Sequence, residues 1–444
     1  LQIHFIKSNA SVLFWLFLLL CKTAQAQGLS LIRDEEVERG LSFYLTPLFE
    51  QAGLEPKNMR IHLVRDDSIN AFAVQGLHVF VHTGLLTKAD NAQEVVAVLA
   101  HETGHIAGGH IVRLYENMRI ARRNMLLSMV LGAVVAGASG RGDAAMGVMS
   151  GMMSSSQGLL AGYRRSEESA ADETAVRLLT ATGHDLSGFA DIMRKLQKQE
   201  DLYDNDTTAP WRSHPMVRER LALISARPSK AADAKRVKRE NDLFLRMKAK
   251  LDGFLSSPQK IKALYKDDSL PSRYARAILV YRTGNFADAE RQVDDLIKTE
   301  PENPYFYELK GQLLFETARG KEAIAPYEKA VGLLPDSDLF RIGLAQAVLS
   351  DEDAPDTNRA LAVLSSVNAD LPAVWRLKAT AYGQSGQTGA AAYALAEYNL
   401  MTGDAKQARR FAKKAADLLP ANDPSALKAR DILEGLKENP PPQR

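Results

Sequence analysis

The sequence predicts a chain of two folded parts, an α+β domain over residues 27–226 and an all-α domain of repeated helix pairs over residues 227–444. Two observations support this division. Short strand-like runs followed by amphipathic helices fill the first part, and small, aromatic and proline residues recur at a fixed period in the second. An apolar leader, residues 1–26, precedes both parts.

The composition is that of an ordinary globular protein. The 444 residues are 45% hydrophobic and 25% charged, and 56 basic side chains nearly balance 54 acidic ones, which gives a net charge of +2. Because no excess of basic residues points to nucleic acid, we expect no nucleic-acid partner. The single cysteine, Cys21, excludes an internal disulfide and a zinc site built on several thiolates.

The leader has the features of a secretory signal peptide. Residues 12–20 are an unbroken apolar run, a basic residue precedes them, and a small-x-small cleavage pattern follows. This run is too short for a membrane-spanning helix, which needs about 20 residues. We therefore predict cleavage before Gln27 and export to a bacterial periplasm. An uncleaved N-terminal anchor and a lipoprotein modified at Cys21 are the alternatives.

Apolar periodicity predicts the elements of the first part. Leucines at helical spacing predict a helix over residues 31–56. Strand-like runs lie at residues 59–64, 71–74 and 77–81. Amphipathic patterns then predict helices from Asn91 onward and over residues 166–182. We expect the strand at 77–81 to form the sheet edge beside a cleft, where an extended substrate would add by backbone hydrogen bonds.

The second part carries a period of 34 residues. Pro301 and Pro335 are 34 positions apart, and so are Ala289 and Ala323. Within one period, the small, aromatic and proline positions of a tetratricopeptide unit are occupied by Gly311, Ala323, Tyr327, Ala330 and Pro335. Stacked units of this kind form a curved solenoid with a concave face that binds other proteins. A helical bundle without repeats is the alternative.

The most informative motif is His101-Glu102-Thr103-Gly104-His105. Four residues turn a helix by about 400°, so His101 and His105 lie on one face, one turn apart. Two imidazoles placed in this way can bind one Zn²⁺, and Glu102 is near enough to take a proton from a water beside it. Two surface histidines on a polar helix are the alternative, but the apolar residues around the motif favour a buried site.

A catalytic zinc site needs a third protein ligand. His110 lies about 140° around the helix from His105, which makes it a supporting or helix-end residue. Glu168 is the better candidate, because Asp172 follows it by one turn and could hold an imidazole N–H. Glu167 is the adjacent rival, and it lacks an acidic partner four residues later.

These motifs together resemble the M48 zinc metallopeptidases. Similar segments include HETGH, the Glu168-x-x-x-Asp172 pair, residues 70–73 and 79–86, and His214-Pro215 followed by Arg220. The resemblance implies a zincin-like (gluzincin) fold with one zinc per chain, held by His101, His105 and Glu168. It also implies that Glu102 is the general base and acid. One or both of His214 and Arg220 would stabilise the oxyanion, or His214 would cap the zinc at rest or only close a loop.

With its leader and repeats, the chain resembles the periplasmic branch of that family that acts in β-barrel assembly. This implies an exported zinc endopeptidase that degrades misfolded or misassembled proteins, with the outer-membrane assembly machinery bound through the repeats. The alternative is a periplasmic chaperone or scaffold with latent or minor peptidase activity. The apolar residues 125–138 are too few to span a bilayer, and they form core, a lid or a peripheral membrane contact.

Overall fold

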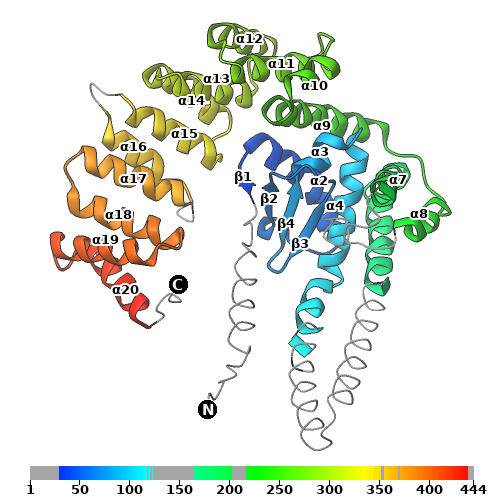
Figure 1. The fold of residues 1–444 in the computed structure, drawn as a ribbon, viewed down its shortest axis with the longest axis horizontal. Coiled ribbons are helices and arrows are strands. Elements are labelled where there is room, and N and C mark those ends of the chain that lie inside the picture. The colour runs from blue at the N-terminus through cyan, green and yellow to red at the C-terminus, as the bar shows by residue number, and fades with distance from the viewer. Residues whose placement is uncertain are drawn as a thin grey trace, which may run out of the picture.

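The structure is a computed structural model that describes residues 30–438, apart from residues 118, 121–122, 124–164, 203–216, 352–354 and 369–370. The expected signal peptide, the apolar residues 125–138 and His214 lie outside the described residues. A small sheet with helices packed on it is followed by an arc of paired helices, which curves around beside the sheet (Figure 1). Among the described residues, no helix is both long enough and apolar enough to cross a membrane.

The sheet has four strands in the order β1-β2-β4-β3. They are β1 (Leu31–Ile32), β2 (Arg60–Val64), β3 (Ala71–Val74) and β4 (His78–His82). β4 pairs in parallel with β2, and β3 pairs with β4 as a hairpin whose turn holds Gly76 at a φ of 90°. The expectation that residues 77–81 form the sheet edge is therefore wrong. Because β4 returns to pair with β2, its hairpin partner β3 is pushed to the outside and becomes the edge.

Helices cover one face of this sheet. They are α2 (Glu35–Gln51), α3 (Thr83–Lys88) and α4 (Ala92–Ala107), and a short 3-10 turn, η1 (Pro56–Asn58), follows α2. The helix expected over residues 31–56 is shorter than predicted, because Asp34 caps its N-terminus and the residues before it pair as β1. Asn91 caps α4 in the same way. The apolar faces of α2 and α4 join the inner face of the sheet in one core.

Further helices follow α4 in this half of the described chain, the first of them at residues 110–117. Residues 165–181 form a helix that ends before Gly183, which has a φ of 81°. α7 (Ser187–Leu202) and α8 (Val217–Ser225) follow. Phe189, Ile192 and Met193 of α7 and Val217 of α8 are buried in the same core as the sheet. The helix that carries Glu168 is thus held against α4 by its neighbours.

The long helix α9 (Ala234–Leu255) joins the two halves. It belongs by sequence to the second part, yet Phe244, Met247 and Leu251 are buried in the core of the first. The hydrophobic core of the first part therefore extends past residues 226 and 227, because apolar side chains of α9 pack into it with those of α2 and α4.

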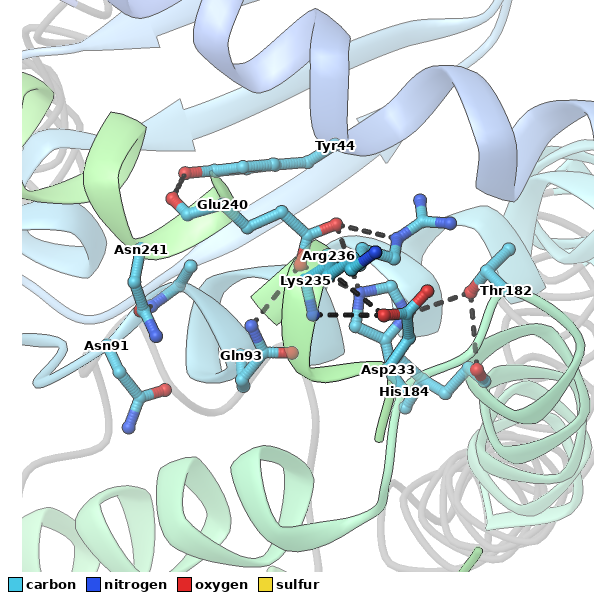
Figure 2. Close-up of polar contacts among 12 residues, drawn as sticks. Tyr44, Asn91, Gln93, Thr182, His184, Asp233, Lys235, Arg236, Glu240 and Asn241 are labelled. Carbon is cyan, nitrogen blue, oxygen red and sulfur yellow. Dashed lines mark hydrogen bonds and ion pairs between the residues drawn. The ribbon is translucent and has the colours of Figure 1, made fainter. Parts of the chain in front are cut away.

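A buried carboxylate on α9 strengthens this contact (Figure 2). Glu240 lies 2.9 Å from Nε2 of His184 and accepts hydrogen bonds from Gln93 of α4 and Arg236. Its backbone oxygen accepts from the hydroxyl of Tyr44 on α2. One residue of α9 thereby connects the start of α4 with the chain that follows helix 165–181.

The arc consists of antiparallel helix pairs built on α9. Its members are α10 (Pro258–Leu264), α11 (Leu270–Arg282), α12 (Phe286–Thr299), α13 (Pro304–Glu316), α14 (Gly320–Leu333), α15 (Asp338–Leu349), α16 (Thr357–Ser365), α17 (Pro372–Gln384), α18 (Thr388–Met401), α19 (Ala405–Leu418) and α20 (Pro424–Glu438). The ring of Tyr327 packs against Gly311, where an added Cβ would lie 2.8 Å from it. Small residues therefore allow the close helix packing that the period predicts.

The first turn of α2 contacts the arc directly. Nζ of Lys250 on α9 lies 2.9 Å from Oδ2 of Asp34. The hydroxyl of Tyr274 on α11 donates to Glu36 at 2.9 Å, and the hydroxyl of Ser337, before α15, donates to Glu35 at 2.8 Å. These polar contacts fix the repeats relative to the sheet domain.

Candidate metal centre and active site

His101 and His105 lie on the buried face of α4. Their Nε2 atoms are 3.1 Å apart, and their ring planes cross at 83°. A helix places residues four apart on one face, which explains the pairing from local geometry alone. Both rings are largely buried, so this pair differs from surface histidines on a polar helix.

Glu168 on helix 165–181 completes a group of three donors. Its Oε2 lies 3.4 Å from Nε2 of His101, and its Oε1 lies 3.3 Å from Nε2 of His105. Zinc ligands at about 2.0–2.2 Å from the ion, in tetrahedral geometry, would be about 3.3–3.6 Å from one another. The three side chains therefore form a set that can hold one metal ion.

Small residues allow the two helices that carry these donors to approach closely. Gly104 faces Ala171, and a Cβ built on Gly104 would lie 2.7 Å from the carbonyl oxygen of Ala171. A side chain at position 104 would separate the helices. The glycine inside the motif thus brings Glu168 within reach of the histidines.

Asp172 and Arg220 support the three donors. Oδ1 of Asp172 lies 2.9 Å from Nδ1 of His101, and Arg220 donates from Nε and Nη2 to the two Asp172 oxygens at 2.7 Å each. Nη1 of Arg220 also lies 2.8 Å from Oε2 of Glu168. Asp172 thus orients the imidazole of His101, and Arg220 holds both carboxylates.

The pKa values of this cluster reflect these contacts. Burial raises the pKa of Asp172, but hydrogen bonds with Arg220 and His101 outweigh burial and lower it to about 2. Burial and the charge of Arg220 both lower the pKa of His101, but Asp172 and Glu168 together raise it to about 9. The cluster thus favours an ionised Asp172 carboxylate facing the imidazole of His101.

Glu102 turns from the same helix toward the sheet edge. Its Oε2 accepts a hydrogen bond from the backbone N–H of Ala73 on β3 at 3.1 Å. The side chain is buried and lines a cavity together with His101. This position lies between the three donors and the edge strand, where a base for a peptide substrate is needed.

The remaining sequence candidates fall in different places. Nδ1 of His110 lies 2.9 Å from Nδ1 of His105, so His110 contacts the ring nitrogen of His105 that faces away from the other donors. Glu167 instead accepts from Arg113 at 3.1 Å and takes no part in the group of three donors. The role predicted for His214 remains a prediction because that residue is not described.

Sequence reasoning missed the residues of α7 that reach the site. The ring of Phe189 lies 6.4 Å from that of His101, centroid to centroid. The amphipathic pattern of residues 187–202 could have indicated a buried helix face, but no motif indicated that this face borders the candidate site.

Comparison with known proteins identifies the fold around this site. The pattern of peptidase family M48 matches residues 35–228, and a tetratricopeptide-repeat pattern matches residues 274–338. The chain carries an M48 peptidase domain followed by tetratricopeptide repeats. The fold predicted from the sequence, a zincin-like domain before a helical solenoid, is confirmed.

The M48 domain and the repeats also match curated relatives. The chain is 24% identical to the beta-barrel assembly-enhancing protease of Yersinia pestis, over 78% of this chain and 72% of the relative. It is 25% identical to a putative beta-barrel assembly-enhancing protease of Vibrio cholerae, over 80% and 75%. The metalloprotease LoiP of Escherichia coli K12 is 26% identical, over 47% and 77%. Together with the donor group, these matches show a metallopeptidase.

Proposed function

We propose that this protein is a zinc endopeptidase exported to the periplasm, where it degrades misfolded or misassembled proteins in the quality control of outer-membrane β-barrel proteins. The single observation that carries the proposal is the convergence of His101, His105 and Glu168 beside Glu102. The names of the curated relatives support the setting.

Each of these side chains has a separate role in the proposed peptide hydrolysis. His101, His105 and Glu168 would hold zinc. When bound, the zinc would polarise the scissile carbonyl and lower the pKa of the attacking water to about 7. Glu102 accepts the proton of the attacking water and passes it to the leaving amine. Arg220 holds Asp172 and Glu168 in place, and any further part for Arg220 at the oxyanion belongs to the same proposal.

The edge strand β3 provides a place for an extended substrate. The backbone oxygen of Asn70 accepts a hydrogen bond from the backbone N–H of His82 within the hairpin. Successive residues of a strand point their backbone groups to opposite sides, so those of Ala71 and Ala73 point to the open edge. The contact from Ala73 N–H to Glu102 shows this direction. A peptide added along β3 pairs through its backbone whatever its sequence, which suits unfolded chains.

The test measures zinc content and cleavage of an unfolded β-barrel protein for wild type, Glu102→Gln and Glu168→Gln. We expect about one zinc in wild type and in Glu102→Gln, cleavage by wild type only, and loss of zinc in Glu168→Gln. Glu167→Gln is the matched control, since Glu167 pairs with Arg113 and should change neither quantity. A wild type that holds no zinc contradicts the proposal.

A second function, as a periplasmic chaperone or assembly scaffold, is favoured by the size of the repeat arc. The helices from α11 to α20 offer a long surface for protein partners, including the outer-membrane assembly machinery. Cells that carry Glu102→Gln in place of wild type separate the two functions. Rescue of outer-membrane assembly by this variant would favour the scaffold.

A further inference from the structure

The helix α19, near the far end of the arc, carries a strongly basic face (Figure 1). Its cations occupy residues 406–414, a stretch that contains no acidic residue: Lys406, Arg409, Arg410, Lys413 and Lys414. All five side chains are exposed. These five side chains form the basic face of α19.

The helix repeat places these cations on one side of α19. Ala408, Ala412 and Ala415 are fully buried against the neighbouring helices. At about 100° per residue, the five cations point away from these alanines, over a length of about 12 Å along the helix. Arg409, at the border of the face, also donates to the backbone oxygen of Leu436 on α20. α19 thus packs through small apolar residues and presents its charge to solvent.

The carboxylates of the described residues do not compensate this charge, because none of them forms an ion pair with the basic face of α19. Asp404 accepts from the backbone N–H of Gln407 as the N-cap of the helix. Asp417, near the end of the same helix, pairs with none of the five cations. The exposed cations of α12 differ, since Arg291 and Lys298 each lie 2.9 Å from an aspartate oxygen. The charge on α19 therefore remains available for an anionic partner.

Exposed apolar side chains lie at both ends of this face. Leu400 and Met401, at the end of α18, precede the turn at Gly403 into α19, and they are 41% and 38% exposed. Leu418 follows Lys414 by one helical turn and is 53% exposed. Cations that attract phosphate, flanked by apolar side chains that can enter the boundary of the acyl chains, are typical of a peripheral membrane surface.

The residue types of this face disfavour other anionic partners. Protein interfaces are depleted in lysine and enriched in aromatic residues, whereas most cations of this face are lysines. Single-stranded nucleic acids stack their bases on aromatic side chains. The one aromatic residue of α19, Phe411, packs on the apolar core of the last helices, and Arg410 lies over its ring at 4.6 Å. Phospholipid headgroups need no such stacking and respond to the charge alone.

We propose that the basic face of α19 docks on membranes that carry anionic phospholipid headgroups. The inference goes beyond the proposed function and needs no catalysis. It also concerns a different surface from the apolar residues 125–138. Because the polar contacts around Lys250 hold the repeats against the M48 domain, docking through α19 would keep that domain close to the membrane surface.

The first test is flotation of the purified full chain with lipid vesicles. Vesicles of phosphatidylcholine with about 30% phosphatidylglycerol should bind at least about tenfold more protein than phosphatidylcholine alone at about 0.1 M salt. This excess should disappear at about 0.5 M salt, because salt screens the charges. Vesicles of phosphatidylcholine alone measure any apolar contact through the leader or residues 125–138, which every sample shares.

The second test removes the lysines of the basic face. Within the described residues, Lys406, Lys413 and Lys414 form no hydrogen bond or ion pair through their side chains, so the fold does not depend on them. The triple variant Lys406→Gln, Lys413→Gln, Lys414→Gln keeps the helix propensity of α19. It should bind the anionic vesicles at least about tenfold more weakly than wild type.

The matched control removes the same amount of charge elsewhere on the surface. It is the triple variant Lys238→Gln, Arg291→Gln, Lys298→Gln, in which each exposed cation already pairs with an aspartate. We expect this variant to bind the anionic vesicles as wild type does. Circular dichroism shows whether both variants are folded, and the salt dependence of wild type tests the proposal without any variant.

The outcomes are distinct. A loss of binding confined to the α19 variant supports the docking surface. Equal binding of wild type to both kinds of vesicle, unchanged binding of the α19 variant, or an equal loss in the control variant would overturn it. Wild type that binds a polyglutamate peptide but not the anionic vesicles would also overturn it and would assign the face to an acidic protein. Cleavage assays bear only on the proposed function.

Discussion

Gly104 shows how one residue determines the geometry of the metal centre. At this position of α4, helix 165–181 comes so close that only 2.7 Å separates an ideal Cβ from the oxygen of Ala171. Glu168 reaches the histidines only because this contact is short. The glycine therefore acts on the site through the distance between two helices, without binding anything itself.

We predict that Gly104→Ala weakens zinc binding although all three donors remain. The added methyl group forces the helices apart and costs about 1–3 kcal/mol of packing energy, more than the helix propensity gained. Zinc affinity by competition with a chelator, together with urea unfolding, measures both effects. Gly332→Ala is the control, since nothing lies within 4 Å of its added Cβ and stability should stay equal or rise. Equal zinc affinity in both variants would contradict the prediction.

Among the elements, the edge strand β3 links the sheet to catalysis. Its N–H at Ala73 points to Glu102, and its other edge is paired with β4. Under the proposed function, an incoming peptide would pair with this edge and release Glu102 for the reaction. Under the proposed function, the strand would position the substrate, and it holds Glu102 through the N–H of Ala73 while no substrate is present.

We predict that Ala73→Pro abolishes cleavage but leaves zinc content unchanged. Proline lacks the N–H that faces the open edge, whereas the pairing with β4 is kept because that N–H takes no part in it. Peptide binding by anisotropy and zinc by atomic absorption give the two readouts. Ala73→Val retains the N–H and should bind peptide nearly as wild type does. Full activity of Ala73→Pro would exclude strand addition at β3.

On the scale of the whole molecule, a buried cluster of charges joins the M48 domain to the repeats. Lys250 contacts Asp34, Glu36 and Glu308, and Tyr274 donates to Glu36. Burial, partly offset by Lys250, raises the pKa of Glu36 to about 7. One cation faces three carboxylates, so the junction favours a proton on one of them near neutral pH.

This junction should become less stable as the pH rises. The folded protein keeps a proton on Glu36 that the unfolded chain releases near pH 4.5, so the stabilising contribution is complete below that pH and is lost as the pH passes about 7. We expect the urea midpoint of wild type to fall between pH 5 and pH 8 relative to that of Glu36→Gln. Glu55→Gln, at an exposed site, should follow wild type. Parallel curves for wild type and Glu36→Gln would contradict the assignment.

The sequence by itself determined the features that depend on short-range geometry. The spacing of His101 and His105 places two imidazoles on one helix face, and the 34-residue period predicts stacked helix pairs, because both follow from the helix repeat. Asn91 marks the start of the next predicted helix through local capping. A structure was not needed to predict these features.

Only the tertiary structure decided which distant segments meet. It brought helix 165–181, with Glu168, to the histidines, made β3 rather than β4 the sheet edge, and placed α7 beside the candidate site. The physical reason is that strand order and helix packing depend on contacts between residues far apart in the chain, which local periodicity does not record. The sequence was enough to identify the candidate metal-binding residues, whereas the cavity beside them could be located only in the folded structure.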